Sequence, residues 1–135
     1  MRVVIDTNIL VSGVFWKGPP AAVLEAWRDG RIEIVLSPAI LDEYQRVARE
    51  LSRRFPLVDL NPIIELLTFN ARMVSDSSLP VAVCSDPDDD KFIHCALVAH
   101  AAALVSGDRA VLSLGPRCGR VAIISVSDAC VRYCR

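Results

Sequence analysis

The sequence predicts an α/β fold in which helices cover both faces of one parallel sheet, giving three layers. Short aliphatic runs alternate along the chain with longer segments in which apolar residues recur at helical spacing. This alternation is typical of parallel strands joined by crossover helices. The chain has 135 residues, 53% of them hydrophobic, so a single domain spanning residues 1–135 has enough apolar side chains for a substantial core.

The predicted strands are rich in valine, isoleucine and leucine and show little alternation with polar residues. That composition is expected where both faces of a strand are buried. We place the strands at residues 2–5, 32–36, 72–74, 103–106 and 121–126. The segments 75–83 and 116–119 contain proline or glycine and are predicted to be loops.

The predicted helices are marked by capping residues, by proline in the first turn and by glycine or proline after the last turn. We expect helices at residues 19–29, 38–55, 61–69 and 88–102, a helix starting within 9–16, a helical turn at 109–114, and a short terminal helix capped by Ser127. Ser37 and Asn61 are the expected caps of the second and third of these. The apolar stripe of the helix over 38–55 consists of Ile40, Tyr44, Val47 and Leu51.

Composition excludes several classes of protein. The formal net charge is −1, so nucleic-acid binding would rest on a local basic patch or on a metal ion. No Gly-Lys-Ser/Thr sequence is present, which argues against P-loop chemistry. Five cysteines without a Cys-x-x-Cys pair, and no signal peptide before the first strand, indicate free thiols in the cytoplasm. No apolar run approaches the roughly 20 residues that span a membrane.

Two aspartates follow apolar strands in the same way. Asp6 follows the run that ends at Ile5, and Asp108 follows the run 103–106 after one glycine. The carboxyl ends of parallel strands form the edge of the sheet where ligands bind, so both carboxylates are expected at that edge. Each aspartate could also be a turn residue, since aspartate is common in turns.

Two further acids are expected to point inward from helices. Glu43 lies three residues after Ile40 and therefore beside the apolar stripe that faces the sheet. Asp90 is the best inward-pointing candidate in the cluster Asp86, Asp88, Asp89 and Asp90, because it shares a helix face with Ile93. The alternatives are that Glu43 extends to water and that the aspartates stabilise the start of a helix.

Four carboxylates that converge on one edge would repel one another unless a cation neutralises them. Ligands that are all oxygen select hard ions, so Mg²⁺ or Mn²⁺ suits Asp6, Glu43, Asp90 and Asp108 better than zinc does. A divalent ion held by carboxylates suits the hydrolysis of phosphodiester bonds. His94 and His100 have no ligand-like company and are expected to be packed or surface residues.

At these residues the chain resembles the PIN-domain ribonucleases, in particular the VapC-like toxins of type II toxin–antitoxin systems. The resemblance rests on Val4-Ile5-Asp6-Thr7-Asn8, on Glu43, on the segment from Asp86 to Ile93, and on Leu104-Val105-Ser106-Gly107-Asp108. It spans Arg2 to Asp108. Many relatives carry threonine in place of Ser106, which keeps the hydroxyl, and the tail after Ile124 matches poorly, so Asp128 receives no role.

The resemblance implies a PIN-like, Rossmann-like topology with about five parallel strands. It also implies a metal-dependent ribonuclease that leaves a 5′-phosphate, is often a homodimer and has an antitoxin protein as its partner. It assigns Asp6, Glu43, Asp90 and Asp108 as metal-binding catalytic acids. Thr7, Asn8 and Ser106 match positions whose side chains hydrogen-bond those acids or the water on the metal.

Two other functions compete with the ribonuclease. A phosphoacceptor receiver domain also has acids at strand ends and one Mg²⁺, but that function requires a lysine at the end of the last strand, where neither Lys17 nor Lys91 can lie. The second is a non-catalytic interaction or RNA-binding protein that has kept the fold. It predicts that the chain binds no Mn²⁺ and cleaves no RNA.

Two surface features are candidates for binding partners. Arg46, Arg49 and Arg53 share one helix face, and we expect Arg46 and Arg49, with Arg109 at the mouth of the site, to guide RNA phosphates. A solvated helix face would give the same pattern. Phe15, Trp16 and the turn at Pro19-Pro20 could form a dimer or antitoxin contact, or could pack against the neighbouring helix.

Overall fold

The computed structural model describes residues 1–75 and 89–134. Most of the expected loop over 75–83, together with Cys84, Asp86 and Asp88, lies outside the described residues. None of the described helices is long and apolar enough to cross a membrane.

The described residues form a six-stranded sheet in the order β3-β2-β1-β4-β6-β5. The strands are β1 (Arg2–Ile5), β2 (Glu33–Leu36), β3 (Arg72–Met73), β4 (Ala103–Val105), β5 (Arg117–Cys118) and β6 (Val121–Ile124). All neighbouring strands are parallel except β5 and β6, which are antiparallel. The predicted α/β class with a central parallel sheet is therefore confirmed.

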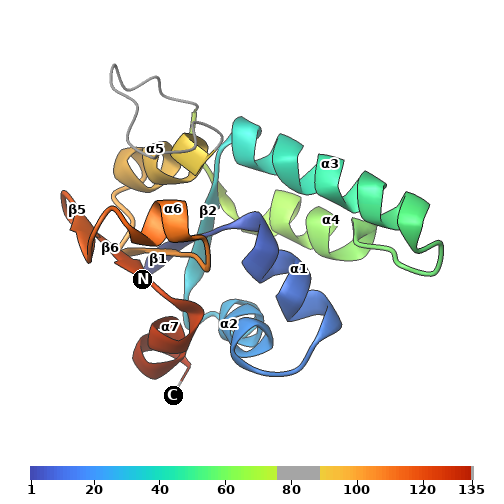
Figure 1. The fold of residues 1–135 in the computed structure, drawn as a ribbon, viewed down its shortest axis with the longest axis horizontal. Coiled ribbons are helices and arrows are strands. Elements are labelled where there is room, and N and C mark those ends of the chain that lie inside the picture. The colour runs from blue at the N-terminus through green and yellow to red at the C-terminus, as the bar shows by residue number, and fades with distance from the viewer. Residues whose placement is uncertain (76–88, 135) are drawn as a thin grey trace.

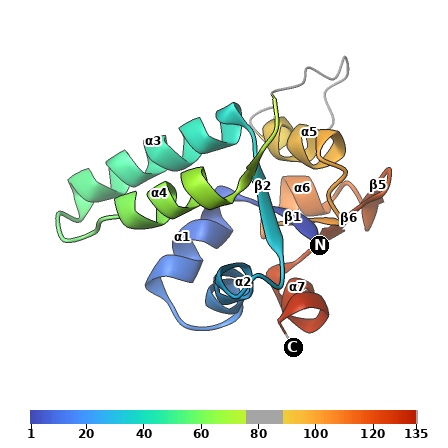
Figure 2. The same ribbon diagram turned by 180° about the vertical axis from the view of Figure 1, so that it is seen from behind.

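Seven helices accompany the described strands. They are α1 (Thr7–Phe15), α2 (Pro19–Arg28), α3 (Pro38–Arg54), α4 (Asn61–Asn70), α5 (Asp90–Val98), α6 (Arg109–Leu112) and α7 (Val126–Tyr133). Figures 1 and 2 show α2 and α7 together on one side of the sheet and α5 and α6 on the other. The long helix α3 runs beside α4, and the pair projects away from the sheet (Figure 1).

One predicted loop is wrong. Residues 116–119 include β5, an edge strand that pairs antiparallel with β6 through Arg117 and Cys118. Gly119 follows with φ of 58°, a left-handed conformation that glycine adopts without strain. Gly119 therefore forms the tight turn of a hairpin, not part of a longer loop.

Two helix caps differ from the prediction. Ser37 caps α3 as expected, because its hydroxyl accepts a hydrogen bond from the Ile40 N–H at 3.4 Å. Asn61 is the first residue of α4 rather than its cap, and its N–H donates to Asp59 Oδ1 at 3.0 Å. The last helix is capped by Ser125 and not by Ser127, because β6 ends two residues earlier than expected.

The helix that was expected to reach Ala102 ends at Val98. His100 has φ of 53°, and the Ala101 N–H donates to the Ala96 carbonyl at 2.9 Å. This is the left-handed turn that closes many helices, here made by a histidine where glycine is usual. The early end frees Ala103 to begin β4.

The core lies on both faces of the central strands. Every residue of β4 and β6 is buried, as are Val3, Val4 and Ile5 of β1. On α3 the buried residues are Ile40, Tyr44 and Ala48, whereas the expected Val47 and Leu51 are half-buried. On α2 the buried residues are Val23, Leu24, Ala26 and Trp27.

The strand register aligns the carboxyl ends of β1 and β4. Ile5 pairs with Val105, so Asp6 and Ser106 each follow the end of a neighbouring strand. The Asp6 N–H donates to the Val105 carbonyl at 3.1 Å and continues the sheet by one bond. The next strand, β6, receives the Ser106 N–H through the Ile124 carbonyl at 3.0 Å.

Candidate active site

Asp6 lies at the carboxyl end of β1 and caps α1. Its Oδ1 accepts from the Ile9 N–H at 3.0 Å, while its Oδ2 accepts from the Ser106 hydroxyl and from the Gly107 N–H at 3.3 Å. Only 5% of the residue is exposed. Burial raises the pKa of Asp6, the hydrogen bonds from Ser106, Ile9 and Gly107 oppose that change, and the nearby charge of Asp108 adds to it. Asp6 is therefore both a cap and a buried carboxylate held between two strand ends.

Asp108 follows β4 and caps the short helix α6. Its Oδ1 accepts from the Ala110 N–H at 2.8 Å, and its own N–H donates to Ser106 Oγ at 3.0 Å. The fully buried Ser106 hydroxyl thus donates to Asp6 and accepts from the backbone of Asp108. One serine fixes the loop that brings the two aspartates together at the sheet edge.

Glu43 reaches the same edge from the second turn of α3. Its Oε2 accepts a hydrogen bond from the hydroxyl of Thr7, the residue after Asp6. Its Oε1 lies 2.7 Å from Lys91 Nζ on α5 and 3.8 Å from an Arg46 guanidinium nitrogen. The Glu43 side chain is 13% exposed, so it does not extend into water as the alternative supposed.

Asp90 is the first residue of α5 and is 8% exposed. Its neighbour in the chain, Lys91, makes the ion pair with Glu43, so the start of α5 faces α3 at this edge. Asn8, by contrast, is exposed in the first turn of α1. Within residues 1–75 and 89–134, no hydrogen bond joins it to Asp6, Glu43 or Asp108. The structure therefore joins Thr7 and Ser106 to the acids, but not Asn8.

Sequence reasoning missed two residues at this edge. Tyr44 was assigned only to the apolar stripe, but its buried hydroxyl donates to the Ile5 carbonyl at 2.5 Å. Burial raises its pKa well above the usual range, and the charges of Asp6, Cys95 and Glu43 act in the same direction. Lys91 was considered only for a receiver-type lysine. It immediately follows Asp90, and a cation among four acids was the signal that could have identified it.

The donor chemistry of the edge suits a hard divalent cation, because Asp6, Glu43, Asp90 and Asp108 offer only carboxylate oxygens. Within the described residues, however, no group of three His, Cys, Asp or Glu side chains already lies at the spacing of metal ligands. Hydrogen bonds and the Lys91 ion pair account for this arrangement, since they hold the carboxylates of Asp6, Glu43 and Asp108 on protein donors. The ligand types fit the ion, but the cluster is not preformed.

A surface depression of about 420 Å³ adjoins Glu43. It is lined by Ala39, Asp42, Glu43, Gln45, Arg46, Arg49 and Lys91. Arg46 and Arg49, two of the three arginines that were expected to contact RNA, therefore lie on the wall of a hollow that reaches Glu43. Arg46 also faces Glu50 at 3.8 Å. Arg109 is exposed at the start of α6, directly after Asp108.

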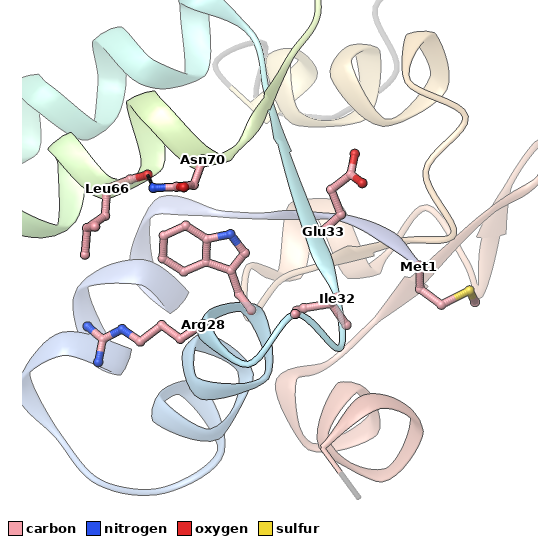
Figure 3. A pocket seen from close by; sticks show the side chains of 8 residues that line it. Met1, Arg28, Ile32, Glu33, Leu66 and Asn70 are labelled. Carbon is pink, nitrogen blue, oxygen red and sulfur yellow. Dashed lines mark hydrogen bonds between the residues drawn. The ribbon is translucent and has the colours of Figure 1, made fainter.

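Two other hollows lie away from the acids. One, of about 490 Å³, is lined by Met1, Trp27, Arg28, Gly30, Ile32, Glu33, Leu66 and Asn70, which lie near the amino ends of β1 and β2 (Figure 3). The other, of about 350 Å³, is apolar and is lined by Val11, Phe15, Trp16, Leu51, Phe55 and Val58. Trp16 is 65% exposed at its rim, so it does not simply pack against α2.

The fold and the acidic edge define an α/β protein with a candidate site at the carboxyl ends of its strands. A PIN domain family model matches residues 2–110. An uncharacterised protein of Methanocaldococcus jannaschii, MJ1680, is 31% identical over 117 residues, which cover 84% of this chain and 75% of that protein. The chain belongs to the PIN domain family, whose members are generally nucleases.

Two solved structures share the fold. PAE2754 from Pyrobaculum aerophilum superposes with a TM-score of 0.65 at 15% identity, covering 98% of this chain and 88% of that one. VapBC2 from Rickettsia felis, solved with a DNA fragment from its promoter, gives a TM-score of 0.61 at 13% identity, covering 93% and 98%. At these identities the likeness shows a common fold.

Proposed function

We propose that this protein is a Mg²⁺- or Mn²⁺-dependent endoribonuclease of the VapC-like group. The observation that carries the proposal is the hydrogen bonding at one edge of the sheet, where Ser106 joins Asp6 to the backbone of Asp108 and Thr7 binds Glu43. Membership of a nuclease family supports it. Asp6, Glu43, Asp90 and Asp108 would hold the ion, and the chemistry that it would supply is activation of a water molecule and polarisation of the phosphoryl group.

The remaining residues of the edge orient these acids. Ser106 and the Gly107 N–H fix Asp6, and Thr7 fixes one oxygen of Glu43. These hydrogen bonds limit the orientations open to Asp6 and Glu43, as supporting side chains do around a metal site. Arg46 and Arg49 on the wall of the depression, and Arg109 beside Asp108, guide the phosphates of the RNA.

A cleavage assay on total RNA tests the proposal. The wild-type protein should cut RNA in Mg²⁺ or Mn²⁺ and should stop when EDTA is added. Asp108→Asn should lose the metal-dependent cleavage while its circular dichroism spectrum stays unchanged. Asp128→Asn is the matched control, because Asp128 is an exposed aspartate in the first turn of α7. Undiminished cleavage by purified Asp108→Asn protein would contradict the assignment.

We further propose that the chain is the toxin of a toxin–antitoxin pair and forms a homodimer in the cytoplasm. The likeness to the VapBC2 structure supports an antitoxin partner. The exposed Trp16 at the rim of the apolar hollow is the candidate dimer contact. Light scattering should give the mass of a dimer for the wild type and of a monomer for Trp16→Ala. An unchanged mass for the variant argues against this contact.

One alternative is a PIN-fold protein that binds RNA or a partner without catalysis. The observation that favours it is the lack of a preformed three-ligand cluster among the described side chains. Calorimetry separates the two functions, because the nuclease must bind Mn²⁺ and the non-catalytic protein must not. The receiver-type alternative needs a lysine after the last strand, and Lys91 lies on α5.

A further inference from the structure

Both carboxylate oxygens of Glu43 are bound by side chains from other elements. Thr7 on α1 donates to Oε2, and Lys91 on α5 lies 2.7 Å from Oε1. The Glu43 and Lys91 side chains are only 13% and 22% exposed, so water screens this ion pair weakly. The pair joins α3 to α5 at the edge of the sheet where the acids lie.

Arg46 offers an internal comparison. It carries the same charge and approaches the same Glu43 oxygen, but at 3.8 Å and with a side chain that is 57% exposed. It also divides its contact between Glu43 and Glu50. Exposed pairs of this kind contribute little, whereas partly buried and hydrogen-bonded pairs resist separation. Of the two cations, Lys91 is therefore the one that holds Glu43.

We propose that Lys91 is a positioning residue that holds Glu43 on the protein and competes with the divalent ion for it. This inference rests on the proposed metal-dependent nuclease function. The Lys91 ammonium supplies a positive charge among the acids, and its contact with Oε1 occupies an oxygen that a hard cation would take. Release of Glu43 from Lys91 then accompanies loading of the site.

Lys91 also belongs to the wall of the depression beside Glu43. Lys91 lines the same depression as Arg46 and Arg49, so a freed Lys91 makes this wall more basic. A phosphodiester in the depression would then meet three cations beside Glu43 instead of two. Loading the acidic edge and creating a phosphate-binding wall are in this way coupled through one side chain.

Calorimetric titration of Mn²⁺ into EDTA-treated, dialysed protein tests the inference without measuring cleavage. Lys91→Gln should bind Mn²⁺ about tenfold more tightly than the wild type, because it breaks a pair that the ion must otherwise displace. Arg46→Gln is the matched control, and its affinity should change by about twofold or less. Lys91→Arg keeps the charge and should remain close to the wild type. Lys91→Ala serves as a second removal of the ammonium.

A double-mutant cycle checks that the effect passes through Glu43. In a Glu43→Gln background, Lys91→Gln should tighten Mn²⁺ binding no more than Arg46→Gln does. If the wild type binds Mn²⁺ and Lys91→Gln binds it with equal or lower affinity, the inference is overturned but the metal site is still supported. Equal tightening by Arg46→Gln also overturns it, because that result is a general charge effect. Failure of every variant and of the wild type to bind Mn²⁺ overturns the metal site and the inference together.

Discussion

Replacing Tyr44 by phenylalanine removes the hydroxyl oxygen that joins α3 to the end of β1. The Tyr44 hydroxyl, on α3 next to Glu43, donates to the carbonyl of Ile5, the residue before Asp6. The residue is 1% exposed, so water cannot replace the lost donor easily. The net loss of a hydrogen bond costs about 1 kcal/mol, and a buried carbonyl that loses its partner costs about 1–3 kcal/mol. We expect the free energy of unfolding to fall by about 1–3 kcal/mol.

Urea denaturation in EDTA measures this change, and Tyr133→Phe is the control because it deletes the same atom from α7. RNA cleavage by Tyr44→Phe should also slow, on the order of tenfold. The variant loses the hydrogen bond that fixes α3, which carries Glu43, against the end of β1, which carries Asp6. The reasoning is refuted if Tyr44→Phe unfolds within about 0.5 kcal/mol of the wild type, the range of ordinary surface substitutions.

Three further substitutions test other parts of the account. Burial raises the pKa of Asp6 above 3.8, so the charged carboxylate lowers the stability of the metal-free fold once pH rises past about 4. Urea titrations should therefore show wild-type stability falling relative to Asp6→Asn as pH rises above about 4, and a rise would contradict the sign. Gly13→Ala places a Cβ 2.8 Å from the Pro20 carbonyl oxygen and should lower the free energy of unfolding by about 1–3 kcal/mol, whereas unchanged urea midpoints would show that α1 and α2 can separate. Reversing the charge of Arg46 and Arg49 should weaken RNA binding and reduce its salt dependence; equal affinity at all salt concentrations would exclude that wall as the RNA contact.

The strands and most helix starts followed from the sequence because their signals are local. Apolar runs such as 103–106 can only be buried, and Ser37-Pro38 carries both a cap and a first-turn proline. The errors also have local causes. A histidine rather than a glycine ends α5, and Gly119 forms a hairpin turn where a longer loop was expected. Neither conformation is visible in residue type alone.

The candidate site was predictable to the extent that it follows from topology. Parallel strands place Asp6 and Asp108 at the same edge, and the helical phase of α3 turns Glu43 toward it. The hydrogen bonds of Tyr44 and Lys91 depend on how α3 and α5 are placed against β1, which no spacing in the sequence determines. The sequence therefore identifies the acids as candidates for the site. It does not show that hydrogen-bond donors of the protein already hold Asp6, Glu43 and Asp108.

The central claim is that the acidic edge cleaves RNA with a divalent ion, and chelation followed by restoration of the ion tests it most directly. A single RNA substrate is incubated with EDTA-treated protein, and Mn²⁺ is then added in excess. We predict that wild-type cleavage stops in EDTA and returns with Mn²⁺, whereas Asp6→Asn, folded by circular dichroism, does not cleave in either condition. Cleavage that persists in EDTA, or that returns in Asp6→Asn at the wild-type rate, would contradict the account.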